Sequence, residues 1–184
     1  MNNKYLILVN KNNPMPDEIK FNIVETDSKY AKDRPLEEKT FEAIKKFRNY
    51  AKENGYVIDI ESGYRSKDYQ QKVWDELESE KGLEYTKRFV AVPGYSEHQT
   101  GLAVDVVLYE NGSWYEDQKL KGHPIVDFLK NNCYKFGFII RYPEGKENIT
   151  GYGWEPWHLR YIDDVDKAKY IMENNLCLEE YLGN

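Results

Sequence analysis

The chain has 184 residues, of which 40% are hydrophobic and 32% are charged, and its formal net charge is −6. This length predicts a single domain, residues 1–184, with room for a sizeable hydrophobic core. The acidic balance, with no block of lysine and arginine, argues against a nucleic-acid partner, because a phosphate backbone requires a basic surface.

The N-terminal segment and the cysteines bear on the cellular compartment. The apolar run at residues 6–9 is shorter than the roughly 7–15 residues of a secretory leader and the roughly 20 of a membrane span. We therefore expect a cytoplasmic protein with no membrane segment; the alternative is an extracytoplasmic protein whose leader or anchor has been removed. Cys133 and Cys177 match no metal motif, and we expect both to be reduced and partly buried.

Strand-like and helix-like segments are interleaved at irregular intervals, without a glycine-rich phosphate loop. Helices are expected where apolar residues recur at helical spacing, and strands where short apolar or alternating runs occur. Proline, glycine and aspartate mark helix boundaries, and an Asn-Gly pair marks a turn within residues 110–114. The expected elements, in chain order, are a strand at 5–9, a helix at 36–54, a strand at 57–60, a helix at 67–80, a strand at 101–108, a helix at 124–136, strands at 137–142 and 156–161, and a helix at 165–174. The pattern predicts a mixed α+β domain, in which helices pack around a small sheet.

The helix expected at 67–80 carries four apolar residues on one side, Tyr69, Val73, Trp74 and Leu77.

An aspartate lies inside the apolar strand expected at 101–108. Side chains alternate between the faces of a strand, so Val104 and Val106 share one face while Asp105 lies on the other. Burying an unpaired carboxylate is expensive, so Asp105 requires a partner. An ion pair or a capping role would satisfy it, and His98, seven residues upstream, could by itself be an ordinary core or loop histidine.

The C-terminal third supplies the residues that favour a metal site. The segment GWEPWHLRY, residues 153–161, contains Glu155 and His158. Together with His98 and Asp105, His158 makes a set of two imidazoles and one carboxylate, which leaves a zinc position open for water, as in catalytic zinc sites. Glu155 is then a spare carboxylate, comparable to the general base of the H-E-x-x-H motif. Glu155 and His158 would face opposite ways on an unbroken strand, so we expect a bend or a strand start at Pro156.

A third segment, ESGYRSKDYQQKVW at residues 61–74, places Arg65 between an expected strand and an expected helix. Its guanidinium could polarise a scissile carbonyl or bind a carboxylate through two parallel hydrogen bonds. The alternative is an ordinary surface arginine.

Taken together, the three segments resemble the D-alanyl-D-alanine carboxypeptidases of the VanY and VanX type, zinc metallopeptidases that are grouped with lysostaphin-like enzymes and the hedgehog signalling domain. The family pattern S-x-H-x-x-G-x-A-x-D, followed by E-x-W-H, reads SEHQTGLAVD at 96–105 and EPWH at 155–158, with every specified position matched. SGYRS matches upstream, and Gln70 lies five residues after Arg65, as is usual there. Segments near both ends also look like this family, and the likeness is greatest to the bifunctional VanXY type.

The resemblance implies a small antiparallel sheet that carries zinc and is flanked by helices, in a single catalytic domain over residues 1–184. It implies a substrate peptide whose C-terminal residue is held by nearby side chains. The roles it implies are zinc ligation by His98, Asp105 and His158, general base catalysis by Glu155, carbonyl polarisation by Arg65, and substrate binding by Gln70, Ser96 and Trp157.

The function implied is hydrolysis of a terminal D-Ala-D-Ala, either in a peptidoglycan precursor peptide or in the free dipeptide. This reaction would deprive vancomycin-type antibiotics of their target. The D,D preference rests on the resemblance alone, so an L,D-carboxypeptidase or an endopeptidase of the stem peptide, as in an endolysin, remains an alternative. A zinc-bearing binding module is another alternative, although it would have no use for Glu155. We expect a monomer or a weak dimer.

Overall fold

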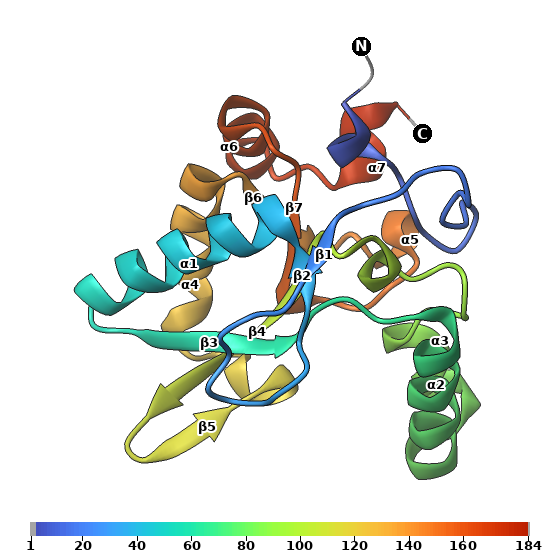
Figure 1. Ribbon diagram of the computed structural model, residues 1–184, viewed down its shortest axis with the longest axis horizontal. Coiled ribbons are helices and arrows are strands. Elements are labelled where there is room, and N and C mark those ends of the chain that lie inside the picture. Colours follow the sequence, from blue (N-terminus) through green and yellow to red (C-terminus); the bar gives the residue numbers. More distant parts are fainter. Residues whose placement is uncertain (1–2, 184) are drawn as a thin grey trace.

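The structure, a computed structural model, describes residues 3–183. At its centre is an antiparallel five-stranded sheet with the order β3-β4-β7-β6, in which β5 pairs with β4 (Figure 1). A separate two-stranded sheet precedes it in the chain. The strands are β1 (Ile23–Val24), β2 (Leu36–Glu37), β3 (Val57–Ser62), β4 (Ala103–Glu110), β5 (Ser113–Tyr115), β6 (Phe138–Tyr142) and β7 (Glu155–Tyr161).

Helices surround this sheet, so the expected α+β class with an antiparallel sheet is confirmed. The α-helices are α1 (Glu38–Glu53), α2 (Lys67–Lys81), α3 (Leu83–Phe89), α4 (Ile125–Asn132), α5 (Glu147–Thr150), α6 (Val165–Glu173) and α7 (Leu178–Leu182). The 3₁₀ turns are η1 (Lys4–Leu6), η2 (Glu97–Thr100), η3 (Asp117–Leu120) and η4 (Cys133–Phe136). Within residues 3–183, no helix combines the length and the apolar character that crossing a bilayer requires.

One face of the large sheet builds the main hydrophobic core. Val104 and Val106 of β4 and Leu159 of β7 pack there with Ile44 and Phe47 of α1, and α4 adds further apolar side chains. α1 and α4 lie on the same side of the sheet (Figure 1). Each fully buried aliphatic or aromatic side chain contributes about 1.5–3 kcal/mol to folding. This core therefore holds β4 and β7 next to each other in a fixed register.

The alternate positions of the same strands point to the opposite face, and that face is polar at its centre. Asp105 of β4, His158 and Arg160 of β7, and Arg141 of β6 are all buried there. The period of two therefore separates an apolar face from a face that carries the chemical groups. The alternation expected for residues 101–108 is confirmed.

Several local signals act as the sequence analysis predicts. The Asn-Gly pair turns the β4–β5 hairpin, with φ of 51° at Asn111 and 79° at Gly112. Asp164 caps α6 by accepting a hydrogen bond from the Lys167 backbone N–H at 3.0 Å. Cys133 and Cys177 are free thiols, and both are fully buried.

The strand expected at residues 5–9 is wrong. Asn3 accepts a hydrogen bond from the backbone N–H of Tyr5 through its side chain and starts the 3₁₀ turn η1 instead. The carbonyl oxygens of Tyr5 and Ile7 accept hydrogen bonds from the Arg160 guanidinium at 2.9 and 2.8 Å. A side chain from the other end of the chain therefore takes two of the acceptors that a neighbouring strand would use.

The bounds of α2 agree with the prediction, and this helix contributes no residue to the main hydrophobic core. Tyr69 is 48% exposed, and the buried residue of this helix is Gln70. α2 and α3 stand to one side of the sheet rather than on its core face (Figure 1). Val73 and Leu77 instead line a cavity that also borders the polar face of the sheet.

Candidate functional site

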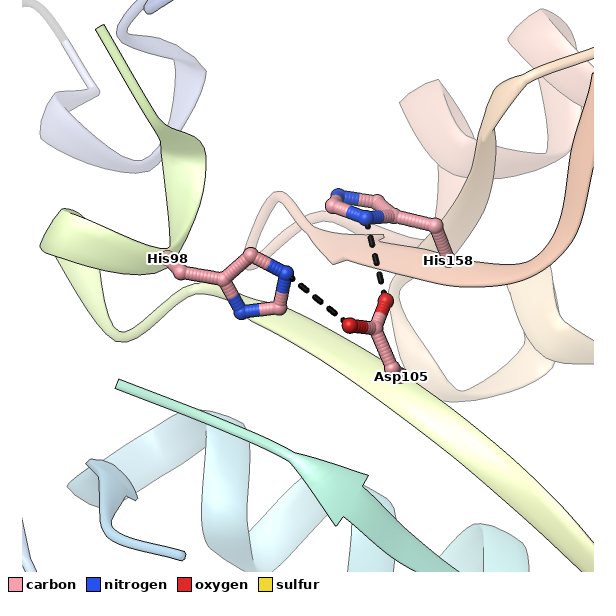
Figure 2. A group of neighbouring side chains, drawn as sticks. All are labelled: His98, Asp105 and His158. Atoms are coloured by element: carbon pink, nitrogen blue, oxygen red, sulfur yellow. Dashed lines mark ion pairs between the residues drawn. The ribbon is translucent and has the colours of Figure 1, made fainter. Parts of the chain in front are cut away.

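Three buried side chains from separate segments converge on the polar face of the sheet. His98 comes from η2, Asp105 from β4 and His158 from β7, and their potential ligand atoms all lie within 4.8 Å of one another. Nε2 of His98 is 3.1 Å from Oδ2 of Asp105, and Nδ1 of His158 is 3.1 Å from Oδ1 (Figure 2). The carboxylate therefore lies between the two imidazoles.

The sheet register sets half of this arrangement, because Asp105 and His158 are direct cross-strand partners on β4 and β7. η2 positions the third residue, His98. Ser96 caps η2 through its hydroxyl, and Gly101 ends it with φ of 73°. A Cβ on Gly101 would lie 2.8 Å from the backbone nitrogen of Glu37, so glycine is required at this position by space as well as by φ.

The second nitrogen of His98 has a partner that determines its orientation. Nδ1 lies 2.7 Å from the carbonyl oxygen of Gly63, and a carbonyl can only accept, so Nδ1 carries the proton. Nε2 then keeps its lone pair facing Asp105, which suits a metal ligand. A Cβ on Gly63 would lie 2.3 Å from the Pro35 carbonyl oxygen, so the glycine of SGYRS permits this close approach.

Burial and two histidine neighbours act in opposite directions on the pKa of Asp105. Burial alone would raise the pKa of Asp105, but His98 and His158 outweigh burial and hold this pKa well below its usual range. Asp105 is 5% exposed, and its Oδ1 atom has no hydrogen-bond donor. An ionised, buried carboxylate with an unsatisfied oxygen beside two imidazole nitrogens fits a divalent cation.

Glu155 is the first residue of β7 and lies beside the same group. Its Oε2 atom is 3.6 Å from Nδ1 of His158. The pairing of β6 with β7 shifts register between Ile140 and Tyr142, so that Tyr142 pairs with Glu155. This irregularity confirms the expected departure from a regular strand near Pro156, and it lets two residues three apart approach one site. Burial, reinforced by Asp105, raises the pKa of Glu155 to about 8 despite the opposing effect of His158.

Arg65 follows β3 and points to the same carboxylate. Its Nη2 lies 3.1 Å from Oδ2 of Asp105, and its Nε donates to the Ser62 hydroxyl at 2.9 Å. Its backbone N–H donates to the carbonyl oxygen of His98 at 3.0 Å. Both the side chain and the main chain of Arg65 thus contact site residues, so Arg65 is not an ordinary surface arginine.

The three residues expected to bind substrate have different surroundings. Gln70 donates from Nε2 to the Ala91 carbonyl at 2.9 Å, and its Oε1 atom is buried without a partner. Ser96 is 3% exposed and caps η2, as described above. Trp157 packs with the main core and reaches the edge of the site.

One cavity of about 330 Å³ is bordered by all of these candidates. The residues expected from the sequence that line it are Arg65, Gln70, Ser96, His98, Asp105, Glu155, Trp157 and His158.

Some residues beside this cavity have no role in the prediction from sequence. The rings of Tyr142 and His158 are tilted relative to each other, with centroids 4.8 Å apart, and the ring centroids of Tyr142 and Tyr152 are 4.9 Å apart. Glu61 also borders the cavity, and burial, aided by Asp105, raises its pKa to about 8. Glu97 lies inside the S-x-H motif at an unspecified position, and its position between two motif residues was the only signal in the sequence.

The family model that describes D-alanyl-D-alanine carboxypeptidases, VanY, matches residues 33–164 of this chain. The chain belongs to the VanY family. The matched region contains η2, β4 and β7, and all of the candidate site residues from Arg65 to His158 lie within it.

Curated relatives of this chain include the putative carboxypeptidase YodJ of Bacillus subtilis, which is 45% identical over 80% of this chain. The bifunctional D-Ala-D-Ala dipeptidase and D-Ala-D-Ala carboxypeptidase VanXYC of Enterococcus gallinarum is 39% identical over 76% of this chain. The alignments cover 54% of YodJ and 75% of VanXYC. This chain therefore corresponds to about half the length of YodJ.

Solved structures of similar proteins superpose over nearly the whole chain. VanYB in complex with D-alanine-D-alanine has a TM-score of 0.85 and 35% identity, and the match covers 98% of both chains. A VanY D,D-pentapeptidase variant in complex with Zn(II), from a VanB-type vancomycin-resistance cassette, has a TM-score of 0.84 over 97% of this chain and 98% of that one. The LD-carboxypeptidase LdcB has a TM-score of 0.85 and 40% identity, over 98% of this chain and 86% of LdcB.

Proposed function

We propose that this protein is a zinc-dependent D,D-carboxypeptidase and D,D-dipeptidase that removes D-alanine from D-Ala-D-Ala termini of peptidoglycan precursors. The observation that carries the proposal is the convergence of His98, Asp105 and His158, with Glu155 beside them, on one cavity. The zinc-bound and D-Ala-D-Ala-bound relatives support it. A link to vancomycin-type resistance belongs to the same proposal.

His98, Asp105 and His158 would hold the zinc through Nε2, the carboxylate and Nδ1. This donor set fits, because the two nitrogens that face Asp105 lie 3.1 Å from it and Oδ1 has no donor. Two imidazoles and one carboxylate are a common zinc set and leave a position open. When bound, zinc supplies Lewis acidity and lowers the pKa of a coordinated water.

Glu155 would act as the general base. Its carboxylate lies 3.6 Å from a proposed ligand atom, so an attacking water in the cavity would be within its reach. Glu155 would accept the proton of this water, orient its oxygen toward the peptide carbonyl, and then deliver the proton to the leaving amine. Glu155 is 5% exposed, and this burial favours the role because it raises the proton affinity of the carboxylate.

Arg65 would stabilise the negative charge that develops on the carbonyl oxygen, because its guanidinium already faces the cavity beside Asp105. Gln70, Ser96 and Trp157 would hold the C-terminal residue of the substrate. Gln70 has a buried amide oxygen available, and Ser96 has a hydroxyl at the cavity wall.

The experiment that tests the function is mass spectrometry of the products from a panel of D-Ala-D-Ala dipeptide, tetrapeptide and pentapeptide precursors. Release of D-alanine from the dipeptide and pentapeptide is the expected result. Cleavage of the tetrapeptide alone would support L,D-carboxypeptidase action, which the likeness to LdcB makes the second candidate. No cleavage of any member would favour a zinc-bearing binding module, and fragments from inside the stem would favour an endopeptidase.

The remaining expectations are part of this proposal. We treat residues 1–184 as one catalytic domain, since the two hydrophobic clusters of the described residues share Met172 at their border. The cytoplasmic location and the monomeric or weakly dimeric state stay predictions. Size-exclusion chromatography with light scattering tests the second of them.

A further inference from the structure

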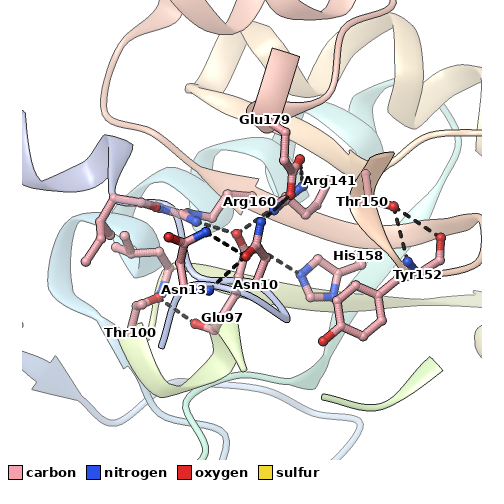
Figure 3. Close-up of polar contacts among 12 residues, drawn as sticks. Asn10, Asn13, Glu97, Thr100, Arg141, Thr150, Tyr152, His158, Arg160 and Glu179 are labelled. Atoms are coloured by element: carbon pink, nitrogen blue, oxygen red, sulfur yellow. Dashed lines mark hydrogen bonds and ion pairs between the residues drawn. The ribbon is translucent and has the colours of Figure 1, made fainter. Parts of the chain in front are cut away.

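Beside His158, four fully buried charged side chains form a compact network (Figure 3). Glu97 of η2, Arg141 of β6, Arg160 of β7 and Glu179 of α7 are 2%, 0%, 0% and 3% exposed. The two positive and two negative charges balance. Because a buried charge is tolerated only with close partners, the position of each member is determined by the others.

Glu97 is the member that joins the network to the proposed metal site. Its Oε1 atom accepts from Nε of Arg141 at 2.7 Å and from Nη1 of Arg160 at 2.5 Å. Its Oε2 atom lies 3.4 Å from Nε2 of His158. One carboxylate oxygen is therefore occupied by two guanidiniums, and the other faces the imidazole.

Both arginines are held in turn by distant parts of the chain. Arg141 forms two hydrogen bonds with the Glu179 carboxylate, at 2.8 and 2.7 Å, and Asn10 donates to the same carboxylate at 3.0 Å. Arg160 donates to the carbonyl oxygens of Tyr5 and Ile7. The rotamer of Glu97 is consequently fixed by the N-terminal segment and by α7.

We propose that Glu97 is a positioning residue: its carboxylate accepts the Nε2–H of His158, which leaves Nδ1 of His158 unprotonated and directed at the metal site. Arg141 and Arg160 hold this carboxylate in place. A histidine ligand is oriented by the group that its other nitrogen contacts, and loss of such a partner weakens metal binding about 10–100-fold. His98 has the mirror arrangement, with Nδ1 on the Gly63 carbonyl and Nε2 free. The inference rests on the proposed metal site.

Histidine-selective ¹⁵N NMR of the wild-type protein tests both ideas and tells them apart, because the chain has only three histidines. On zinc addition, we expect His158 to bind through Nδ1 with Nε2 protonated and His98 to bind through Nε2 with Nδ1 protonated. His123, whose Nε2 contacts Glu110 instead, serves as the internal reference. If zinc perturbs neither His98 nor His158, the proposed metal site fails. If zinc binds His158 through Nε2, the metal site stands and the role of Glu97 is overturned.

Zinc affinity measured by competition with a chromophoric chelator is the second readout. Glu97→Gln keeps the shape but removes the charge that holds both guanidiniums, so we expect the Kd for zinc to rise about 10–100-fold. Asp59→Asn is the matched control, because Asp59 is also a buried acid, 3% exposed, which accepts hydrogen bonds from the backbone N–H groups of Lys29 and Tyr30 and does not border the cavity. It should lower Tm while leaving the zinc Kd unchanged.

A folded Glu97→Gln protein with the wild-type zinc Kd would overturn the inference. Equal losses of zinc affinity in Glu97→Gln and Asp59→Asn would also overturn it, because the effect would then follow general destabilisation. If Glu97→Gln does not fold, the tautomer of His158 in the wild-type spectrum still decides the question.

Discussion

Replacing Glu155 with glutamine tests two effects of this buried carboxylate: its contribution to catalysis and its effect on the stability of the fold. The variant keeps the shape of the side chain and loses the proton acceptor. General acid–base catalysis contributes about 10²–10⁴-fold, so we expect kcat for D-alanine release to fall by this factor, or by about 2.7–5.4 kcal/mol of transition-state stabilisation. Zinc content should be unchanged, since the three proposed ligands remain.

The same substitution should stabilise the metal-free protein. The pKa of Glu155 is raised from its ordinary value of 4.5 to about 8, mainly by burial, so the folded state disfavours the ionised form. Relative to a neutral glutamine, this acid destabilises the fold increasingly as pH rises from about 4.5 to 8. At pH 7 the difference amounts to about 3 kcal/mol, because each unit of pKa corresponds to about 1.4 kcal/mol.

Steady-state kinetics, elemental analysis for zinc, and thermal unfolding in chelator between pH 5 and 8 measure these effects. Glu180→Gln is a suitable control, because Glu180 pairs with Lys146 near the C-terminus and does not border the cavity. Near-normal turnover in Glu155→Gln would show that another group is the base. Loss of zinc together with activity would show that Glu155 is a ligand. A pH-independent stability difference would refute the argument from burial.

Other substitutions and substrates test the remaining assignments. The double variant His98→Ala, His158→Ala should lose zinc in elemental analysis, and full zinc retention would refute the ligand set. Arg65→Lys keeps the charge but loses the planar fork, so kcat should fall more than KM rises; the opposite split in steady-state kinetics would mean that Arg65 only anchors the substrate carboxylate. A peptide amide ending in D-Ala-D-Ala should be cut at least tenfold more slowly than the free acid, because the partners of the carboxylate lose their bonds; equal rates would indicate an endopeptidase. The same panel with L-Ala at the terminus tests the D preference, and equal cleavage of both would remove it.

Much of the site could be predicted from the sequence because its chemistry is local. Asp105 stands out as a charge in an apolar strand, and the alternation of that strand determines which face it occupies. Asp105 and His158 then face each other across β4 and β7. Gly63 and Gly101 belong to recognisable motifs, although the close backbone approaches that require them are visible only in the structure.

Local sequence signals predict the residue types of the site, the α+β class and the approximate bounds of four helices and of four strands of the large sheet, because hydrophobic periodicity and capping residues act over a few positions. The conformation of residues 5–9, where Arg160 takes the backbone acceptors, and the position of α2, which borders a cavity rather than the core, depend on long-range packing. The same packing decides the surroundings of Glu97. An acid between two motif residues has no distinguishing pattern, and its partners Arg141 and Arg160 come from strands more than forty residues away. Burial and charge pairing between segments distant in the chain depend on the packed fold, so local sequence patterns do not predict them.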